Sequence, residues 1–331
     1  MNFSNLNKVV LTASLLVTGF SYADSDRPLL SLNVSQSGGT ALNSEGSLDT
    51  RTPASQSRVL PIWGDEARAR GYDLPEPFGA SYSYMNLRQD IIVDKIGFAA
   101  SEWPQMSDVV TVDVGHTREK SETHLLKLDS WVFPFLNLYG VYGRTKGTSS
   151  TTINQVIVDF GFPFPVAQNE KFNLDFKGNT YGAGFTLAGG YNQFFGTFDL
   201  NYTKTNLDIL DGDIKALVIS PRVGYEFVFS PLISGQGNTK LQVWTGAMYQ
   251  DITQRFKGDV SKLSLPGKLN DFLNSPDLDI GNVKFDVEQH LAHKWNQTVG
   301  ARLEVTRNFN VITELGFNNR NSFFVSGEFR F

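Results

Sequence analysis

Eight acidic and basic side chains fall within segments of alternating residues whose opposite face is apolar. They are Asp199, Arg222, Glu226, Arg302, Glu304, Glu314, Glu328 and Arg330. If the polar face lines an enclosed interior, these charges must pair or stay hydrated, because an isolated buried charge is too costly. The pattern therefore predicts either a structural network of arginine–glutamate pairs or a narrow polar conduit or ligand pocket.

Four histidines offer little basis for catalysis or metal binding. His116, His124, His290 and His293 could in principle activate a serine, since hydrolases pair a nucleophile with a base that a carboxylate or amide orients. No sequence context marks such a pair, and a spacing of three brings His290 and His293 to one face only in a helix. We therefore expect a protein that is not an enzyme and holds no cofactor and no metal.

The charged positions belong to long segments of period-two alternation. Between Trp295 and Val305, for example, one face carries Trp295, Val299, Ala301, Leu303 and Val305, and the residues of the opposite face are polar or glycine. Such segments are longer than the usual strand of a soluble sheet and match a tilted strand that crosses a bilayer. We predict ten strands, near residues 80–93, 122–133, 137–146, 179–191, 194–206, 214–229, 241–254, 294–305, 309–318 and 321–331.

The connections between these strands sort by length. The short ones fall on the side of the C-terminus, and the long ones, about 94–121, 147–178 and 255–293, fall on the other side, as in outer-membrane barrels. Two strand-like pieces, at 109–114 and 151–160, could extend the sheet or raise the number of strands to twelve. The fold class predicted is all-β: a closed antiparallel transmembrane β-barrel of about ten strands.

The end of the chain supports a barrel over a soluble sandwich. In the last segment Phe323, Val325, Phe329 and Phe331 share one face, and the chain stops on an aromatic residue. This resembles the C-terminal strand by which the barrel-assembly machinery recognises bacterial outer-membrane barrels. The resemblance implies these four residues as the assembly signal.

The N-terminus predicts export. Lys8, the short apolar run from Val9 to Gly19 and the small-residue site ending at Ala23 indicate a cleaved signal peptide over 1–23. Residues 24–79, rich in Ser, Gly, Thr and Pro, predict a periplasmic arm with a short helix near 63–71 that could seal the barrel mouth. Residues 80–331 are then the barrel.

Composition narrows the class further. The net charge of −5 argues against nucleic-acid binding, and no second apolar stretch approaches the length of a membrane helix. The chain has no cysteine, while 30 Gly, 26 Phe and 11 Tyr suit strands, tight turns and aromatic girdles. We therefore expect a β-rich exported protein whose partners are outer-membrane lipid and lipopolysaccharide.

Two internal segments add a family resemblance. Residues 130–140 (SWVFPFLNLYG) and 219–225 (ISPRVGY) resemble recurring pieces of a group of uncharacterised or virulence-related proteobacterial outer-membrane proteins. With the closing strands, the likeness covers most of residues 64–331. It implies a barrel in the outer membrane and brings no functional residue with it.

Three functions remain open from the sequence. The first is a structural barrel or a narrow channel, with a small polar solute as the expected cargo. The second is a surface-exposed binding or adhesion barrel, and the third is an outer-membrane hydrolase. The sequence leaves the solute, the partner and the oligomeric state undetermined.

Overall fold

A computed structural model describes residues 41–42, 48–49, 59–69, 74–100, 108, 110–159, 162–191, 193–208, 211–235, 238–260, 271 and 283–331. The predicted signal peptide lies outside the described residues, as do most of the predicted arm and most of the segment from 261 to 282. Among the described residues, no helix has the length and apolar character needed to cross a membrane.

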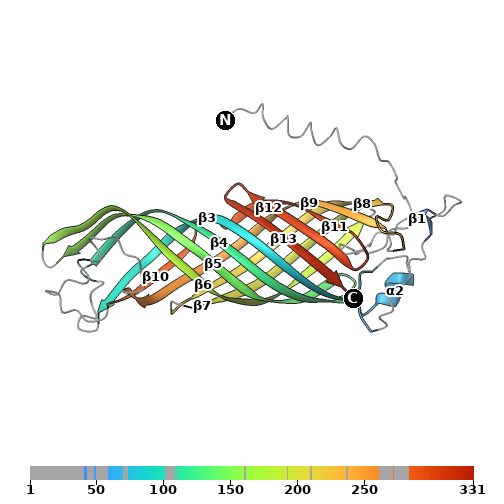
Figure 1. Cartoon of the computed structure of the whole chain (residues 1–331), viewed down its shortest axis with the longest axis horizontal. Helices are drawn as coiled ribbons and strands as arrows, with labels where there is room; N and C mark the ends of the chain where they lie inside the picture. The colour runs from blue at the N-terminus through green and yellow to red at the C-terminus, as the bar shows by residue number, and fades with distance from the viewer. Residues whose placement is uncertain are drawn as a thin grey trace, which may run out of the picture.

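Eleven strands form one antiparallel sheet that closes on itself (Figure 1). They are β3 (Phe78–Ala100), β4 (Val110–Phe133), β5 (Leu136–Asp159), β6 (Pro163–Tyr191), β7 (Phe194–Leu207), β8 (Asp213–Phe229), β9 (Thr239–Asp259), β10 (Val283–Leu291), β11 (Trp295–Glu304), β12 (Phe309–Phe317) and β13 (Arg320–Arg330). The short pair β1 (Ala41–Leu42) and β2 (Leu48–Asp49) and the helix α2 (Gly64–Ala69) precede them.

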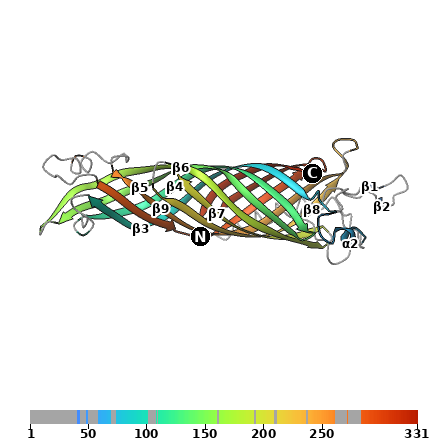
Figure 2. The same ribbon diagram turned by 90° about the horizontal axis from the view of Figure 1, so that it is seen from below.

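The barrel has two ends, which we call the near end and the far end. The near end holds the C-terminus and α2 (Figures 1 and 2). There β13 pairs with β3 from Arg330 opposite Gly79 to Arg320 opposite Gln89, which closes a ring of ten strands without β10. The predicted all-β class and the closed antiparallel ring of ten strands are confirmed.

Strand β10 changes the ring toward the far end. It pairs with β9 on one side and with β3 on the other, beyond the point where β11, β12 and β13 stop. The ring there contains eight strands, β3 to β10. Along β3, residues 79–89 pair with β13 and residues 91–100 pair with β10, so β10 continues the wall that β13 forms at the near end.

The prediction of long surface loops at 94–121 and 147–178 is wrong, and at 255–293 it is wrong in part. Strands β4 and β5 each have 24 residues and β6 has 29, so most of 94–121 and 147–178 is strand. Part of 255–293 is strand as well, in the last residues of β9 and in β10. A strand of 24 residues is about 80 Å long at roughly 3.3 Å per residue, more than twice what a bilayer core requires.

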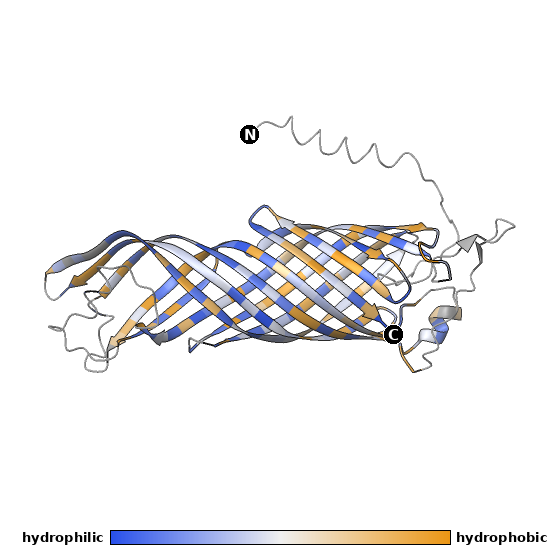
Figure 3. Ribbon diagram, in the orientation of Figure 1, coloured by the Kyte–Doolittle hydropathy of each residue, from blue (hydrophilic) through white to orange (hydrophobic). Residues whose placement is uncertain are grey.

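The strands reverse their polarity along the barrel. In the near half, apolar side chains such as Leu128, Val223 and Phe329 are exposed on the outer surface, while Glu328 and Asn310 are buried inside. Figure 3 shows apolar and polar residues alternating along these strands.

In the far half the pattern is the opposite. The buried inward side chains form an apolar cluster of Ile91, Phe98, Val110, Ile153, Val156, Val158, Leu174, Phe176, Ile214, Ile252, Phe256, Val260, Val283, Phe285 and Leu291. Outward side chains there form ion pairs, such as Lys146 Nζ with Glu122 at 2.9 Å and Arg255 with Asp286 at 2.9 Å. The near half therefore has the polarity of a membrane barrel, and the far half that of a water-soluble one.

Candidate functional site in the barrel interior

The lowest layer of the near half is a chain of buried ion pairs. Arg302 Nη2 donates to Glu328 Oε1 at 2.8 Å, and Arg330 contacts the same carboxylate at 3.3 Å. Arg330 also donates to Asp129 Oδ2 at 3.0 Å, and Asn137 donates to that oxygen at 2.6 Å. Strands β4, β5, β11 and β13 are thereby joined across the inside of the barrel.

A second layer lies against the opposite part of the wall. Arg222 makes a bidentate pair with Glu314, with distances of 2.6 and 3.0 Å, and Trp244 Nε1 donates to the same carboxylate at 2.7 Å. Bidentate guanidinium–carboxylate pairs are among the stronger polar contacts in proteins. This contact joins β8 to β12, two strands that are not neighbours in the sheet.

Asp199 lies in the same layer with no arginine bonded to it in the structure as described. Its carboxylate accepts hydrogen bonds from the Tyr139 hydroxyl at 2.9 and 3.0 Å and from the Thr186 hydroxyl at 2.7 Å. The Tyr139 ring covers Gly184, where a Cβ atom would lie 2.7 Å from its Cζ. Glycine on β6 thus makes room for the aromatic ring inside the barrel.

The remaining sequence-predicted charges also face inward. Gln242 Nε2 donates to Glu226 at 2.7 Å, and both side chains are buried. Glu304 is 3 % exposed and lies opposite Lys240 of β9 in the sheet register. The eight predicted positions therefore all line the near half, and the structure groups five of them into the two arginine–carboxylate clusters described above.

The predicted assembly residues lie on the outer face of β13. Phe323, Phe329 and Phe331 are exposed, and Val325 is half-buried beside them. The Phe331 ring stacks with that of Phe78 at 6.1 Å, at the seam where β13 meets β3.

The segment before β3 contacts the near end. Trp63 packs against Phe133 at 5.0 Å, and Ile62 donates its N–H to Val132 O at 2.8 Å. Glu76 makes the polar contacts: its carboxylate pairs with Arg307 at 3.0 Å, and its backbone carbonyl accepts a hydrogen bond from Arg330 Nε of the lumen network at 3.0 Å.

The sequence predicts that charges of the 63–71 piece, Glu66, Arg68 and Arg70, meet lumen residues such as Glu328 and Arg330. Glu66 is instead exposed, and the side chains of Arg68 and Arg70 lie outside the described residues. The contact with the network comes from Glu76, between α2 and β3.

Between the ion pairs and the far half, the inward side chains are polar but uncharged. The hydroxyls of Thr123, Thr145, Thr180 and Thr205 are linked in series across β4 to β7 at 2.7–3.0 Å. This row could not be predicted from the sequence, because threonine on an inward face carries no distinctive signal.

A polar floor crosses the barrel above this row. Gln254 of β9 donates to Glu119 of β4 at 2.5 Å, Gln89 donates to Glu119 at 3.3 Å, and Gln289 of β10 donates to Gln254 at 2.5 Å. We call these four residues the floor. Strands β4 and β9 are not neighbours, so their side chains meet across the lumen and obstruct it.

Glu119 is the one carboxyl group of the floor. It is 3 % exposed, and burial raises the pKa of its carboxyl above the ordinary 4.5, against the opposing effect of the amide hydrogen bonds. Its position lies outside the apolar outer band, since the outward neighbour Glu122 pairs with Lys146.

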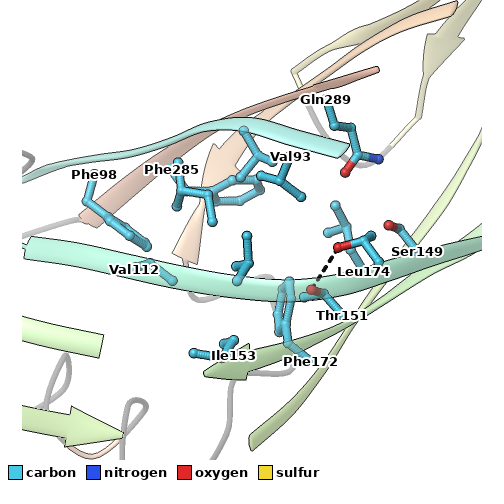
Figure 4. A pocket seen from close by; sticks show the side chains of 14 residues that line it. Val93, Phe98, Val112, Ser149, Thr151, Ile153, Phe172, Leu174, Phe285 and Gln289 are labelled. Carbon is cyan, nitrogen blue, oxygen red and sulfur yellow. Dashed lines mark hydrogen bonds between the residues drawn. The ribbon is translucent and has the colours of Figure 1, made fainter. Parts of the chain in front are cut away.

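An apolar chamber lies on the far side of the floor. Its walls come from β3, β4, β5, β6 and β10, and Figure 4 shows Phe285 and Val93 facing Ile153 and Phe172 across it. Gln289 of the floor lies at one end of the chamber, beside Ser149. Neither the chamber nor the floor was predicted, because their residues fell largely in segments interpreted as loops.

His116, His124 and His290 lie on the outer surface beside polar partners on neighbouring strands, and His293 is exposed between β10 and β11. His124 bonds the Tyr82 hydroxyl at 2.7 Å, His116 contacts Asp90 at 3.2 Å, and His290 contacts Asp94 at 2.7 Å. In the part of the chain that the structure describes, no group of three or more potential metal ligands gathers.

Comparison with known proteins gives structural neighbours only. No protein-family model and no curated protein matches the chain. The transport unit of the autotransporter AIDA-I from Escherichia coli matches with a TM-score of 0.34 and 10% identity, over 77% of this chain and 90% of that one.

Two further solved structures are similar at the same low level. The outer membrane protein OprG from Pseudomonas aeruginosa has a TM-score of 0.34 and 13% identity, over 78% of this chain and 98% of that one. The Ralstonia pickettii toluene transporter TbuX has a TM-score of 0.29 and 8% identity, over 78% and 90%. Similarity at this level transfers neither an activity nor a substrate to this chain.

Proposed function

We propose that this protein is an outer-membrane β-barrel with a narrow-channel role, in which side chains of the floor control passage. The observation that carries the proposal is the reversal of polarity along the strands. An exposed apolar surface on the near half requires lipid, and a charged surface on the far half requires water.

The apolar outer band has the height of a bilayer core. On β7 it runs from Phe194 to Tyr202, nine residues, and the next outward residue is Lys204, which pairs with Asp213 at 3.0 Å. A tilted transmembrane strand needs about 9–11 residues. By the same criterion, residues 125–133 of β4 span the membrane, and its remaining residues project beyond the bilayer.

The near end is the periplasmic end in this proposal. The turns there are short, such as the two residues between β4 and β5, and β13 ends in the aromatic pattern expected of an assembly signal. The far end, with the chamber and the extended strands β3 to β6, then faces the outside. Outer-membrane barrels place their longer connections on that side.

A channel, rather than a purely structural barrel, is supported by how the interior is organised. The chamber is separated from the ion pairs of the near half by polar side chains, the threonine row and the floor, in which Glu119 is the one carboxyl group. Side-chain rotation about the Glu119–Gln254 contact would open the floor, and rotation of side chains in the ion-pair layers would open the path below it, without breaking any strand pairing. The small polar solute expected from the sequence is proposed as cargo only for the charged interior of the near half.

Single-channel recording in planar bilayers tests the role. Gln254→Ala removes the amide that reaches Glu119 across the lumen, so openings should become more frequent than in the wild type. Gln297→Ala, on the exposed outer face of β11, is the matched control and should behave as the wild type. Folded wild type and Gln254→Ala that both give no current steps would overturn the channel proposal.

A further inference from the structure

The chamber contains space that the protein does not fill. The free space between its lining side chains amounts to about 60 Å³. A single water needs roughly 10–15 Å³ of such space, so the chamber has room for more than one water-sized group. Because protein interiors are normally packed as densely as organic crystals, an opening of this size inside the ring is unlike an ordinary core.

The lining is apolar except at the end next to the floor. Aromatic rings approach from three different strands, with Phe98 on β3, Phe172 on β6 and Phe285 on β10 (Figure 4). None of the fourteen lining residues has an ionisable side chain, although outward residues of the same strands, such as Lys284 and Asp286, are charged. The apolar character is therefore specific to the inner face.

We propose that the chamber is a binding site for a small uncharged apolar molecule, of the size of a single aromatic ring with short substituents. This rests on the proposed function only for the direction of entry, from outside through the far end. Cavities lined by Leu, Ile and Phe stay dry and bind benzene-sized ligands. A charged ligand would lose its hydration and find no opposite charge in the lining.

One end of the site can take a polar substituent. Ser149, Thr151 and Gln289 lie together at the floor, and the Thr151 hydroxyl already accepts a bond from Thr117 at 2.8 Å. The Thr151 proton is then available to donate to a hydroxyl or carbonyl oxygen. A short polar substituent on the apolar molecule would therefore be oriented toward the floor.

Binding of toluene to the full chain in nanodiscs of deuterated lipid tests the site, with saturation-transfer NMR from protein methyl groups as the readout. Val112 is half-buried at the chamber wall, so Val112→Phe fills the space and should weaken toluene binding about tenfold or more. Thr111→Phe, the exposed neighbour on the opposite face of β4, should leave the affinity unchanged. Val287→Phe fills the same space from β10 and serves as the second variant.

The site is supported if toluene binds saturably and the charged analogue benzoate does not. Toluene binding should also be lost in both filling variants and kept in Thr111→Phe. Equal transfer in the wild type and both filling variants would show partition into lipid only and overturn it. Toluene binding without conductance would remove the channel proposal and leave the site intact. Conductance without saturable toluene binding would overturn the binding site and leave the channel proposal intact.

Discussion

Val223 offers the sharpest test of where lipid meets the barrel. It lies on the outer face of β8, midway between Phe229 at the near end and Leu217 at the top of the band, and its side chain is 64% exposed. Because it makes few protein contacts, Val223→Arg changes mainly the interaction with the surroundings. A cation at the bilayer midplane costs about 2–4 kcal/mol.

A matched position lies above the band. Thr253 has nearly the shape of valine and is exposed on the outer face of β9, where its cross-strand partners are Lys215 and His290. Thr253→Arg stays in water, so its cost should be a few tenths of a kcal/mol, from like-charge repulsion alone. The two substitutions thus introduce the same side chain on the same surface at different depths.

Reversible denaturant titration of the barrel into lipid vesicles gives both values. We expect Val223→Arg to lower the free energy of unfolding by about 2–4 kcal/mol, equivalent to a factor of roughly 30–1,000 in the folding equilibrium. Thr253→Arg should remain close to the wild type. Equal costs at the two positions, or a larger cost at Thr253, would refute the assignment of lipid to the near half.

Three further perturbations test the interior. Burial raises the pKa of the Glu119 carboxyl in the folded barrel, so its contribution to stability is fully present below the unfolded pKa of 4.5 and is lost as the pH rises through the folded pKa. Glu119→Gln should therefore flatten the pH dependence of stability above pH 4.5 and stabilise the barrel at pH 7. An unchanged stability profile would contradict this. Arg330→Met leaves the Asp129 carboxylate, which is 0% exposed, without its cation and should cost about 3–5 kcal/mol in vesicle titrations, with a loss below 1 kcal/mol speaking against a buried pair. Gly184→Val places a Cβ 2.5 Å from the backbone oxygen of Leu200 and 2.7 Å from the Tyr139 ring, so it should cost about 1–3 kcal/mol, measured in the same way, and a neutral result would contradict this close packing.

The near half could be predicted because one rule governs it. Where the outside is lipid, every second residue must be apolar over the full crossing, so segments such as 194–206 and 309–318 agree with β7 and β12 to within a residue. The same alternation put all eight predicted charges on the inward face. Which of these charges pair with one another could not be predicted, because a contact such as that of Arg222 with Glu314 depends on strand order and tilt rather than on spacing in the sequence.

The far half was predicted only in part, because its polarity is reversed. The strand-like pieces 109–114 and 151–160 do extend the sheet, as parts of β4 and β5. On β10 the residues Val283, Phe285 and Val287 alternate with charged ones, which is a clear strand signal. In a strand that crosses a bilayer those charges would face lipid, so the sequence was interpreted there as a loop. Inward apolar and outward charged residues describe a strand of a soluble barrel, and a sequence criterion that allowed both polarities would have found the chamber walls.

Depth along one strand tests the central claim most directly. The chain contains no cysteine, so single cysteines carrying a nitroxide can be placed in turn on the outer face of β5. We predict that labels at 138, 140 and 142 collide with oxygen dissolved in lipid, and that labels from 144 to 152 collide with a water-soluble nickel complex. The change should fall between Tyr142 and Arg144. A lipid-like signal along the whole of β5, or a water-like signal at Leu138, would contradict a barrel whose strands leave the membrane partway along their length.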